Sequence, residues 1–154
     1  MKKIVFYLLI IALLLTGCSK KIEVIEDNNT SNNKEEKTNN NEEINQMKAI
    51  IHNKEYIINL ENNTTVDALI KLLPLELNMN ELNGNEKYVY LDDELPTNTY
   101  SPKKINTGDV MLFGNNCLVV FYKSFNTSYT YTKIGHINNL PDLGKDNILI
   151  KITN

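Results

Sequence analysis

Short runs of apolar or alternating residues, each ended by turn-forming residues, dominate the sequence from residue 47 to residue 154. Alternation of apolar and polar residues with a period of two is typical of a half-buried β-strand. Residues 47–51 and 56–60 are two such runs, and the polar tetrad 52–55 between them favours a hairpin with a four-residue loop. We therefore expect one mainly β domain over residues 47–154, a size that suits a single core.

Six further segments have the character of strands, namely 75–79, 87–91, 109–113, 117–122, 128–134 and 148–152. Asn83-Gly84 and residues 114–116 are turn sequences that join neighbouring strands. Residues 92–108 hold few apolar side chains and are expected to form a long loop, a kind of segment that is often functional. Eight strands of this kind predict a closed or nearly closed barrel, with a two-sheet sandwich as the alternative.

One helix stands out among the strands. Four apolar residues beginning at Val66 recur at i, i+3, i+4 and i+7, Thr64 is placed to cap the segment, and Pro74 ends it. The pattern predicts a helix over about 64–73. A second, much shorter helical turn is expected near 138–143.

The N-terminal segment has a different character. Two lysines precede an uninterrupted apolar run at residues 4–15, which is too short for the roughly 20 residues that a membrane-spanning helix needs. Such a run suits the central region of a cleaved signal peptide, here residues 1–17. The run ends in Leu15-Thr16-Gly17-Cys18, which resembles the lipobox of bacterial lipoproteins. An ordinary secretory signal with a chance cysteine is the alternative.

The lipobox resemblance implies that the Cys18 thiol carries a diacylglyceryl group, so that the membrane itself is a partner. Two acyl chains give stable anchoring where one would be marginal. Residues 18–46 are rich in Asn, Glu and Lys and poor in apolar side chains, so we expect a disordered tether after the lipidated cysteine. The globular domain is then expected at the outer face of the bacterial cell membrane.

Charge and composition narrow the classes of partner. The chain has 16 basic residues, all of them lysine, against 19 acidic residues, and its formal net charge is −3. Recognition of nucleic acid needs a basic stripe or patch, and this sequence has none. With Cys18 consumed by lipid, Cys117 has no partner for an internal disulfide. We therefore expect no nucleic-acid partner and a fold that depends on its core.

Five separated motifs carry a family resemblance, namely 81–88, 95–97, 108–112, 116–122 and 129–135. In this order they resemble the bacterial cyclophilin-like domain family, over nearly all of residues 47–154. The resemblance implies the closed eight-stranded barrel of the cyclophilins. Some members of that family are lipoproteins.

The same resemblance implies one candidate activity, extracytoplasmic peptidyl-prolyl isomerisation. Cyclophilin catalysis depends on an arginine whose planar fork holds the prolyl carbonyl, and lysine cannot copy that two-donor geometry. This chain has no arginine, and it has Lys133 where the family motif often has arginine. An apolar pocket alone could still lower the rotational barrier of about 20 kcal/mol by desolvating the amide. The isomerase or foldase is therefore the alternative function, and an enzyme is less expected than a binding module.

The leading hypothesis is a binding module for an unknown small ligand, peptide or envelope protein. Its candidate binding face consists of tyrosines, two turn asparagines and a lysine, namely Tyr88, Tyr90, Asn115, Asn116, Tyr122, Tyr129, Tyr131 and Lys133. Phenol rings give a large contact area with a polar tip. Strand packing is the alternative explanation of the tyrosines, and turn chemistry is the alternative for the asparagines.

Other constellations of reactive side chains point to no further chemistry. His52 and His136 are the only histidines, and no second cysteine is free, so we expect no metal and no cofactor. Cys117 and His136 could pair as a nucleophile and a base, but Cys117 opens an apolar strand, where cysteine usually acts as a small hydrophobe. The acidic triplet at residues 92–94 lacks the spacing of a calcium loop and is expected to be a solvated turn.

Overall fold

The computed structural model describes residues 44–154. The predicted signal peptide at 1–17, the lipid attachment at Cys18 and the tether up to residue 43 lie outside the described residues. Within residues 44–154, no helix is long and apolar enough to cross a membrane. The first strand begins at Gln46, one residue before the predicted start of the domain at residue 47.

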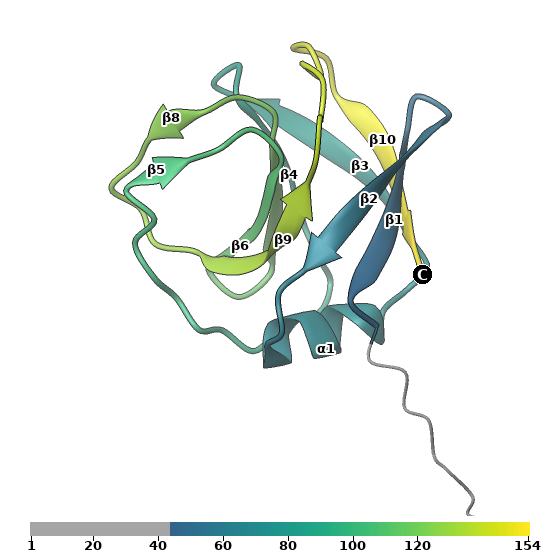
Figure 1. Ribbon diagram of the computed structural model, residues 1–154, viewed down its shortest axis with the longest axis vertical. Coiled ribbons are helices and arrows are strands. Elements are labelled where there is room, and N and C mark those ends of the chain that lie inside the picture. The colour runs from purple at the N-terminus through teal and green to yellow at the C-terminus, as the bar shows by residue number, and fades with distance from the viewer. Residues whose placement is uncertain (1–43) are drawn as a thin grey trace, which may run out of the picture. The chain divides into compact units, whose positions relative to one another are not determined.

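Eight antiparallel strands close into a barrel (Figure 1). The strands, in chain order, are β1 (Gln46–Ile51), β2 (Lys54–Leu60), β3 (Leu75–Leu82), β4 (Glu86–Tyr90), β6 (Asp109–Phe113), β7 (Cys117–Phe121), β9 (Thr132–Ile137) and β10 (Ile148–Thr153). Around the barrel they run β1-β10-β3-β4-β7-β6-β9-β2. The predicted closed barrel is confirmed, and the two-sheet sandwich is wrong.

A glycine permits the closing contact between β2 and β9. Gly135 lies opposite Leu60 in the register of these strands. A Cβ atom at residue 135 would lie 2.4 Å from the backbone oxygen of Asn59. Only a residue without a side chain allows the two backbones to approach this closely. The glycine of the motif 129–135 therefore serves barrel closure.

A two-residue turn joins β1 to β2, and three-residue turns join β3 to β4 and β6 to β7. His52 and Asn53 both adopt positive φ, 49° and 62°, as a type I′ turn requires. Strand β2 accordingly begins at Lys54, and the predicted four-residue loop is wrong. The predicted tight turn at Asn83-Gly84 is confirmed, with φ values of 57° and 71°.

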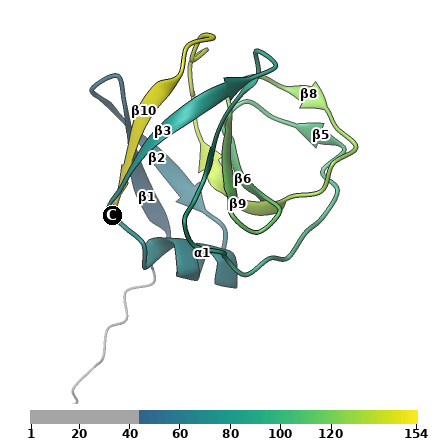
Figure 2. The ribbon, with the colours of Figure 1, turned by 180° about the vertical axis from the view of Figure 1, so that it is seen from behind.

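The helix α1 (Thr64–Ile70) lies across one end of the barrel in both views (Figures 1 and 2) and packs Val66 and Leu69 onto the core. Its end is earlier than the predicted residue 73, because Leu72 and Leu73 continue as a turn toward Pro74. The predicted cap is also wrong. The side chain of Asn63, rather than Thr64, accepts the Val66 N–H at 3.0 Å.

No helical turn forms near 138–143. Asn138 and Asn139 make a simple turn, and residues 140–144 are irregular. Pro141 has no N–H to donate, and the Asp142 side chain instead accepts the Gly144 N–H at 2.9 Å. Leu140 and Leu143 still bury their side chains, which explains the apolar spacing in the sequence.

The long loop predicted at 92–108 contains a strand, β5 (Lys104–Ile105), which pairs with β8 (Phe125–Asn126) in a small ribbon beside the barrel. The predicted strand at 128–134 begins late, because β9 starts at Thr132. Before it, Tyr131 forms an isolated bridge with Tyr100. Strands β5 and β8 lie beside the barrel and cover part of its outer face.

The apolar residues form two separate clusters. The inner cluster fills the barrel with residues from all its strands and from α1, including Leu118 and Val120 of β7. The outer cluster consists of Ile105, Met111, Cys117, Val119, Phe121 and Tyr131, with Tyr88 and Phe125 packed against it. Successive residues of a strand point to opposite faces, so β7 supplies both clusters.

Candidate functional site

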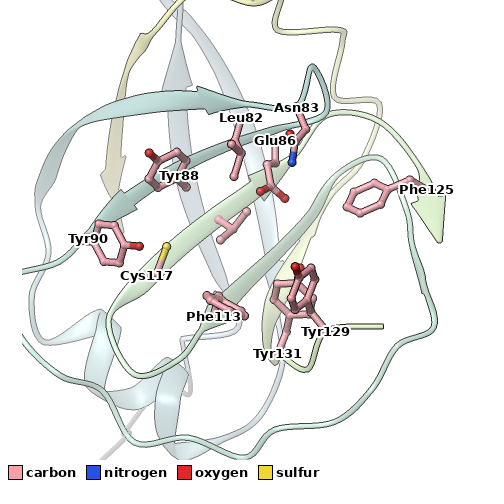
Figure 3. A pocket seen from close by; sticks show the side chains of 11 residues that line it. Leu82, Asn83, Glu86, Tyr88, Tyr90, Phe113, Cys117, Phe125, Tyr129 and Tyr131 are labelled. Atoms are coloured by element: carbon pink, nitrogen blue, oxygen red, sulfur yellow. The ribbon is translucent and has the colours of Figure 1, made fainter. Parts of the chain in front are cut away.

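A pocket lies on the outer face of β4, β6 and β7, where the β5–β8 ribbon leaves part of the outer cluster uncovered (Figure 3). Its volume is about 310 Å³. We call it the outer pocket, and it is lined by Leu82, Asn83, Glu86, Tyr88, Tyr90, Phe113, Cys117, Val119, Phe125, Tyr129 and Tyr131. A volume of this size falls at the lower end of the range for small-molecule sites.

The walls of the outer pocket are aromatic. On one side the rings of Tyr88 and Tyr90 meet edge to face, with centroids 6.0 Å apart and planes at 83°. On the other side the ring centroids of Phe113 and Tyr129 are 5.8 Å apart, with their planes at 84°. The ring centroids of Phe113 and Tyr131 are 5.6 Å apart. Edge-to-face contacts of this kind hold each ring in place and leave other ring faces open to the pocket.

Two of these tyrosines are largely exposed to solvent. Tyr90 is 64% exposed and Tyr129 is 63% exposed, while Tyr131 is buried beneath them at 5%. Strand alternation explains the wall formed by Tyr88 and Tyr90, since Glu86, Tyr88 and Tyr90 share one face of β4. The pocket thus has a fixed floor and two exposed rims.

Glu86 is the only charged side chain among the residues that line the pocket. Figure 3 shows its carboxylate between the two aromatic walls. Burial, and to a smaller extent the neighbouring charge of Glu81, raises the pKa of Glu86 to about 6. No lysine within residues 44–154 forms an ion pair with Glu86. The pocket therefore holds an unpaired acid that is ionised above about pH 6.

Cys117 lies on the floor of the outer pocket with its thiol buried. Burial, followed by the charge of Glu86, raises the pKa of Cys117 to about 11. The thiol is therefore protonated at neutral pH and is a poor nucleophile. His136 does not line the pocket, and its Nδ1 atom lies 3.1 Å from Asp109 Oδ1. The geometry does not support a nucleophile–base pair of Cys117 and His136.

The structure divides the predicted binding face. Tyr88, Tyr90, Tyr129 and Tyr131 line the outer pocket together. Tyr122 is instead buried in the inner cluster, where its hydroxyl lies 3.2 Å from Glu81 Oε1. The alternation of β7 explains this, because Tyr122 follows the outward-facing Phe121.

The remaining three predicted residues lie away from the outer pocket. Asn115 and Asn116 form the turn between β6 and β7, where the Asn116 side chain donates to Leu91 O at 3.1 Å. Lys133 forms an ion pair with Glu61 at 2.7 Å and borders a different, more polar hollow. The asparagines thus hold the loop that follows β4, and Lys133 faces another surface.

Seven of the eleven residues that line the outer pocket were not part of the predicted binding face, and the charged and aromatic ones among them are Glu86, Phe113 and Phe125. The first could have been found from alternation, because Glu86 stands two residues before Tyr88. Phe113 ends β6 and is 41% exposed, which no strand pattern predicts. Phe125 reaches the site only through the pairing of β5 with β8.

Lys87, the residue after Glu86, points into the barrel. Lys87 is fully buried inside the barrel end, and its Nζ donates to the backbone oxygens of Gly144 and Asp146, each at 2.7 Å. The ammonium also lies 5.0 Å from the ring centroid of Tyr122. Burial lowers the pKa of Lys87, while the nearby acids act in the opposite direction. This lysine is held by the protein and is not presented to the outer pocket.

The described residues bring no group of three or more His, Cys, Asp or Glu side chains together as a metal site. The predicted acidic turn at 92–94 is exposed and irregular.

Comparison with known proteins agrees with this geometry. The model of the cyclophilin-like family matches residues 49–153, and the chain belongs to that family. The prokaryotic membrane lipoprotein lipid attachment site matches residues 1–19. The protein is therefore a membrane-anchored lipoprotein that carries a cyclophilin-like domain. No curated protein and no solved structure matches the chain.

Proposed function

We propose that the cyclophilin-like domain is a ligand-binding module held at the outer face of the bacterial membrane by the lipid on Cys18. The outer pocket is the proposed binding site, with Tyr88, Tyr90, Tyr129 and Tyr131 as its contact residues. If the residues between Cys18 and β1 form the flexible tether that the sequence predicts, their root-mean-square span would be ~30 Å. Such a tether lets the domain meet ligands clear of the lipid headgroups.

One observation carries this proposal, the gathering of six aromatic rings around an open hollow of about 310 Å³. Soluble domains rarely leave such rings exposed in one place unless something covers them. The rings are also fixed by edge-to-face contacts, so little side-chain entropy is lost when a ligand enters. A preorganised apolar surface with one polar group is typical of small-molecule sites.

Prolyl isomerisation is the second candidate that the family suggests. Stabilising the oxygen of a twisted amide needs strong donors, and arginine supplies them best. The chain has no arginine, and the one charged group among the residues that line the pocket is the Glu86 carboxylate, which accepts rather than donates above about pH 6. The geometry therefore supports binding better than isomerisation.

The anchor is tested by fractionation of cells that express the full chain. We expect the wild-type protein to partition into detergent and the Cys18→Ala variant to remain in the aqueous phase. Mass spectrometry of the wild-type N-terminal peptide should show a diacylglyceryl adduct on Cys18. A Cys18→Ala variant that still partitions into detergent contradicts the proposed anchor.

The pocket is tested by what the intact lipoprotein retains. We expect detergent-extracted wild-type protein to carry a small molecule, detected by mass spectrometry, that is reduced at least tenfold in Val119→Phe. The new ring would fill the floor of the outer pocket, because Val119 is part of the outer cluster. Leu149→Phe is the matched control, since Leu149 is exposed on β10. Equal retention by all three proteins, each with an unchanged melting temperature, would overturn the proposed site.

A further inference from the structure

We propose that the outer pocket recognises a small organic cation that carries an alkylated ammonium group. This inference rests on the proposed binding function and names the class of ligand. The arrangement behind it is an unpaired carboxylate, Glu86, set between two aromatic walls.

Charge complementarity selects a cation. The lining residues include Glu86 and no lysine. The lysine adjacent in sequence, Lys87, is turned into the barrel and is satisfied by two backbone oxygens. A ligand with a positive group would meet an unopposed carboxylate, whereas an anionic ligand would meet repulsion.

The aromatic walls add to the same selection. The face of a phenol or benzene ring is negative, and a cation within about 6 Å of a ring centroid is attracted to it. Tyr88 with Tyr90, and Phe113 with Tyr129, form two ring pairs whose planes are nearly perpendicular, and both pairs line the same pocket as Glu86 (Figure 3). Sites built from several such walls recognise quaternary ammonium groups.

Hydration favours an alkylated ammonium over a bare one. A bare ammonium is a compact and strongly hydrated charge with N–H donors that all need acceptors. The floor of the outer pocket, Cys117 and Val119, offers it only the weakly accepting sulfur of Cys117. Methyl groups on nitrogen remove those donors, reduce the cost of leaving water and bury apolar surface against the floor. The hollow of about 310 Å³ has room for a choline-sized molecule.

The ionisation of Glu86 gives the site a dependence on pH. The ionisable groups around Glu86 are Glu81 from β3, Cys117 from β7, and the tyrosines that line the same pocket, Tyr88, Tyr90, Tyr129 and Tyr131. Burial raises the pKa values of the Cys117 thiol and the Tyr131 phenol, so both groups are neutral at neutral pH. Lys87 lies on the same strand but inside the barrel. Loss of the Glu86 charge as pH falls through about 6 should therefore weaken binding of a cation.

The test is a titration of the detergent-extracted lipoprotein, by calorimetry or by NMR, with three matched probes at pH 7.5. Choline carries an alkylated ammonium, ethanolamine a bare one, and 3,3-dimethylbutan-1-ol is the uncharged isostere of choline. We expect choline to bind at least tenfold more tightly than the isostere and more tightly than ethanolamine. Glu86→Gln should weaken choline binding about tenfold and leave the isostere unchanged. Glu94→Gln, at an exposed glutamate outside the pocket, is the control.

Each outcome decides between the two proposals. If the isostere binds as well as choline, or if Glu86→Gln leaves choline binding unchanged, the cation inference is wrong and the binding pocket stands. Tighter binding of ethanolamine than of choline would overturn the preference for alkylation. If none of the three probes binds and Val119→Phe also changes no retained molecule, the proposed function itself fails. A folded Glu86→Gln variant is verified by its melting temperature.

Discussion

The two faces of β4, β6 and β7 are built from alternate residues of the same strands, yet they differ in every physical respect. The inner face is closed by aliphatic side chains such as Leu118 and Val120, and its one charge, Lys87, is held by the protein's own carbonyl groups. The outer face is aromatic and open around the pocket, and the one charged residue that lines this pocket, Glu86, has no cationic partner within residues 44–154. Polar groups satisfied from within stabilise a fold, whereas polar groups left unsatisfied in a hollow are available to a ligand.

The largest expected effect is the difference in packing between the inner face and the outer face. Leu118→Ala opens a cavity inside the barrel and should lower the free energy of unfolding by about 2–5 kcal/mol. Val119, the next residue, borders an existing hollow, so Val119→Ala should lower the free energy of unfolding by less than half as much. Urea denaturation of both variants measures the difference. Equal losses would show that the outer face is packed as tightly as the interior.

Reactivity of the floor cysteine is the next prediction. The pKa of Cys117 is raised from 9.0 to about 11, so its thiolate fraction at pH 8 should be about a hundredfold below that of a free thiol. Iodoacetamide should therefore modify the folded protein about a hundredfold more slowly than the urea-unfolded protein. Mass spectrometry follows the reaction over time. Similar rates in the two states would mean that the floor of the outer pocket is solvated.

A matched pair of tyrosines tests the comparison at the level of a single hydroxyl. Tyr122→Phe removes the contact of a buried hydroxyl with the Glu81 carboxylate and should cost about 1–2 kcal/mol of unfolding free energy. Tyr90→Phe removes a hydroxyl from an exposed rim and should change stability by less than about 0.5 kcal/mol. Thermal and urea denaturation give both values. A larger loss for Tyr90→Phe would contradict the assignment of these residues to opposite faces.

The smallest expected effect is the pH dependence contributed by Glu86. Its pKa is about 6 in the folded state against 4.5 for the free side chain, so the folded state binds the proton more tightly. The stabilisation this gives is present below about pH 4.5 and is lost as pH rises through about 6. Glu86→Gln should flatten the curve of stability against pH in this window, and Glu94→Gln should leave it unchanged. Urea midpoints at pH 4.5, 5.5, 6.5 and 7.5 provide the measurement.

Most of the fold could be predicted from the sequence because it depends on local patterns. The alternation of each strand, the left-handed turn at Asn83-Gly84 and the helical period after Val66 each depend on residues that are close together in the sequence. The end of α1 and the irregular segment after Asn139 could not be predicted, since tertiary burial of Leu73 and Leu143 imitates helical spacing. The pairing of β5 with β8 depends on contacts between distant segments, which a single sequence does not reveal.

The site was less accessible to sequence reasoning. Four of the predicted tyrosines meet in the outer pocket, but a tyrosine carries no mark of the face to which it points. The side chain of Tyr122 points into the barrel because it continues the alternation of β7. Lys133 forms an ion pair with Glu61 on another surface. Glu86 was overlooked since the sequence does not show that the only lysine beside it is buried. The phase of each strand, rather than its composition, decides what reaches the pocket.

The position of β1 bears on how the anchored domain responds to pulling. This strand follows the tether directly, and it is hydrogen-bonded on both sides, to β2 from Gln46 to Ile51 and to β10 from Lys48 to Ile51. Tension transmitted from the lipid would run along β1 and load two ladders of hydrogen bonds in shear at the same time. A strand at a sheet edge, pulled in the same direction, would load only one such ladder. The closed barrel therefore gives the strand nearest the anchor support from two neighbours against mechanical extraction.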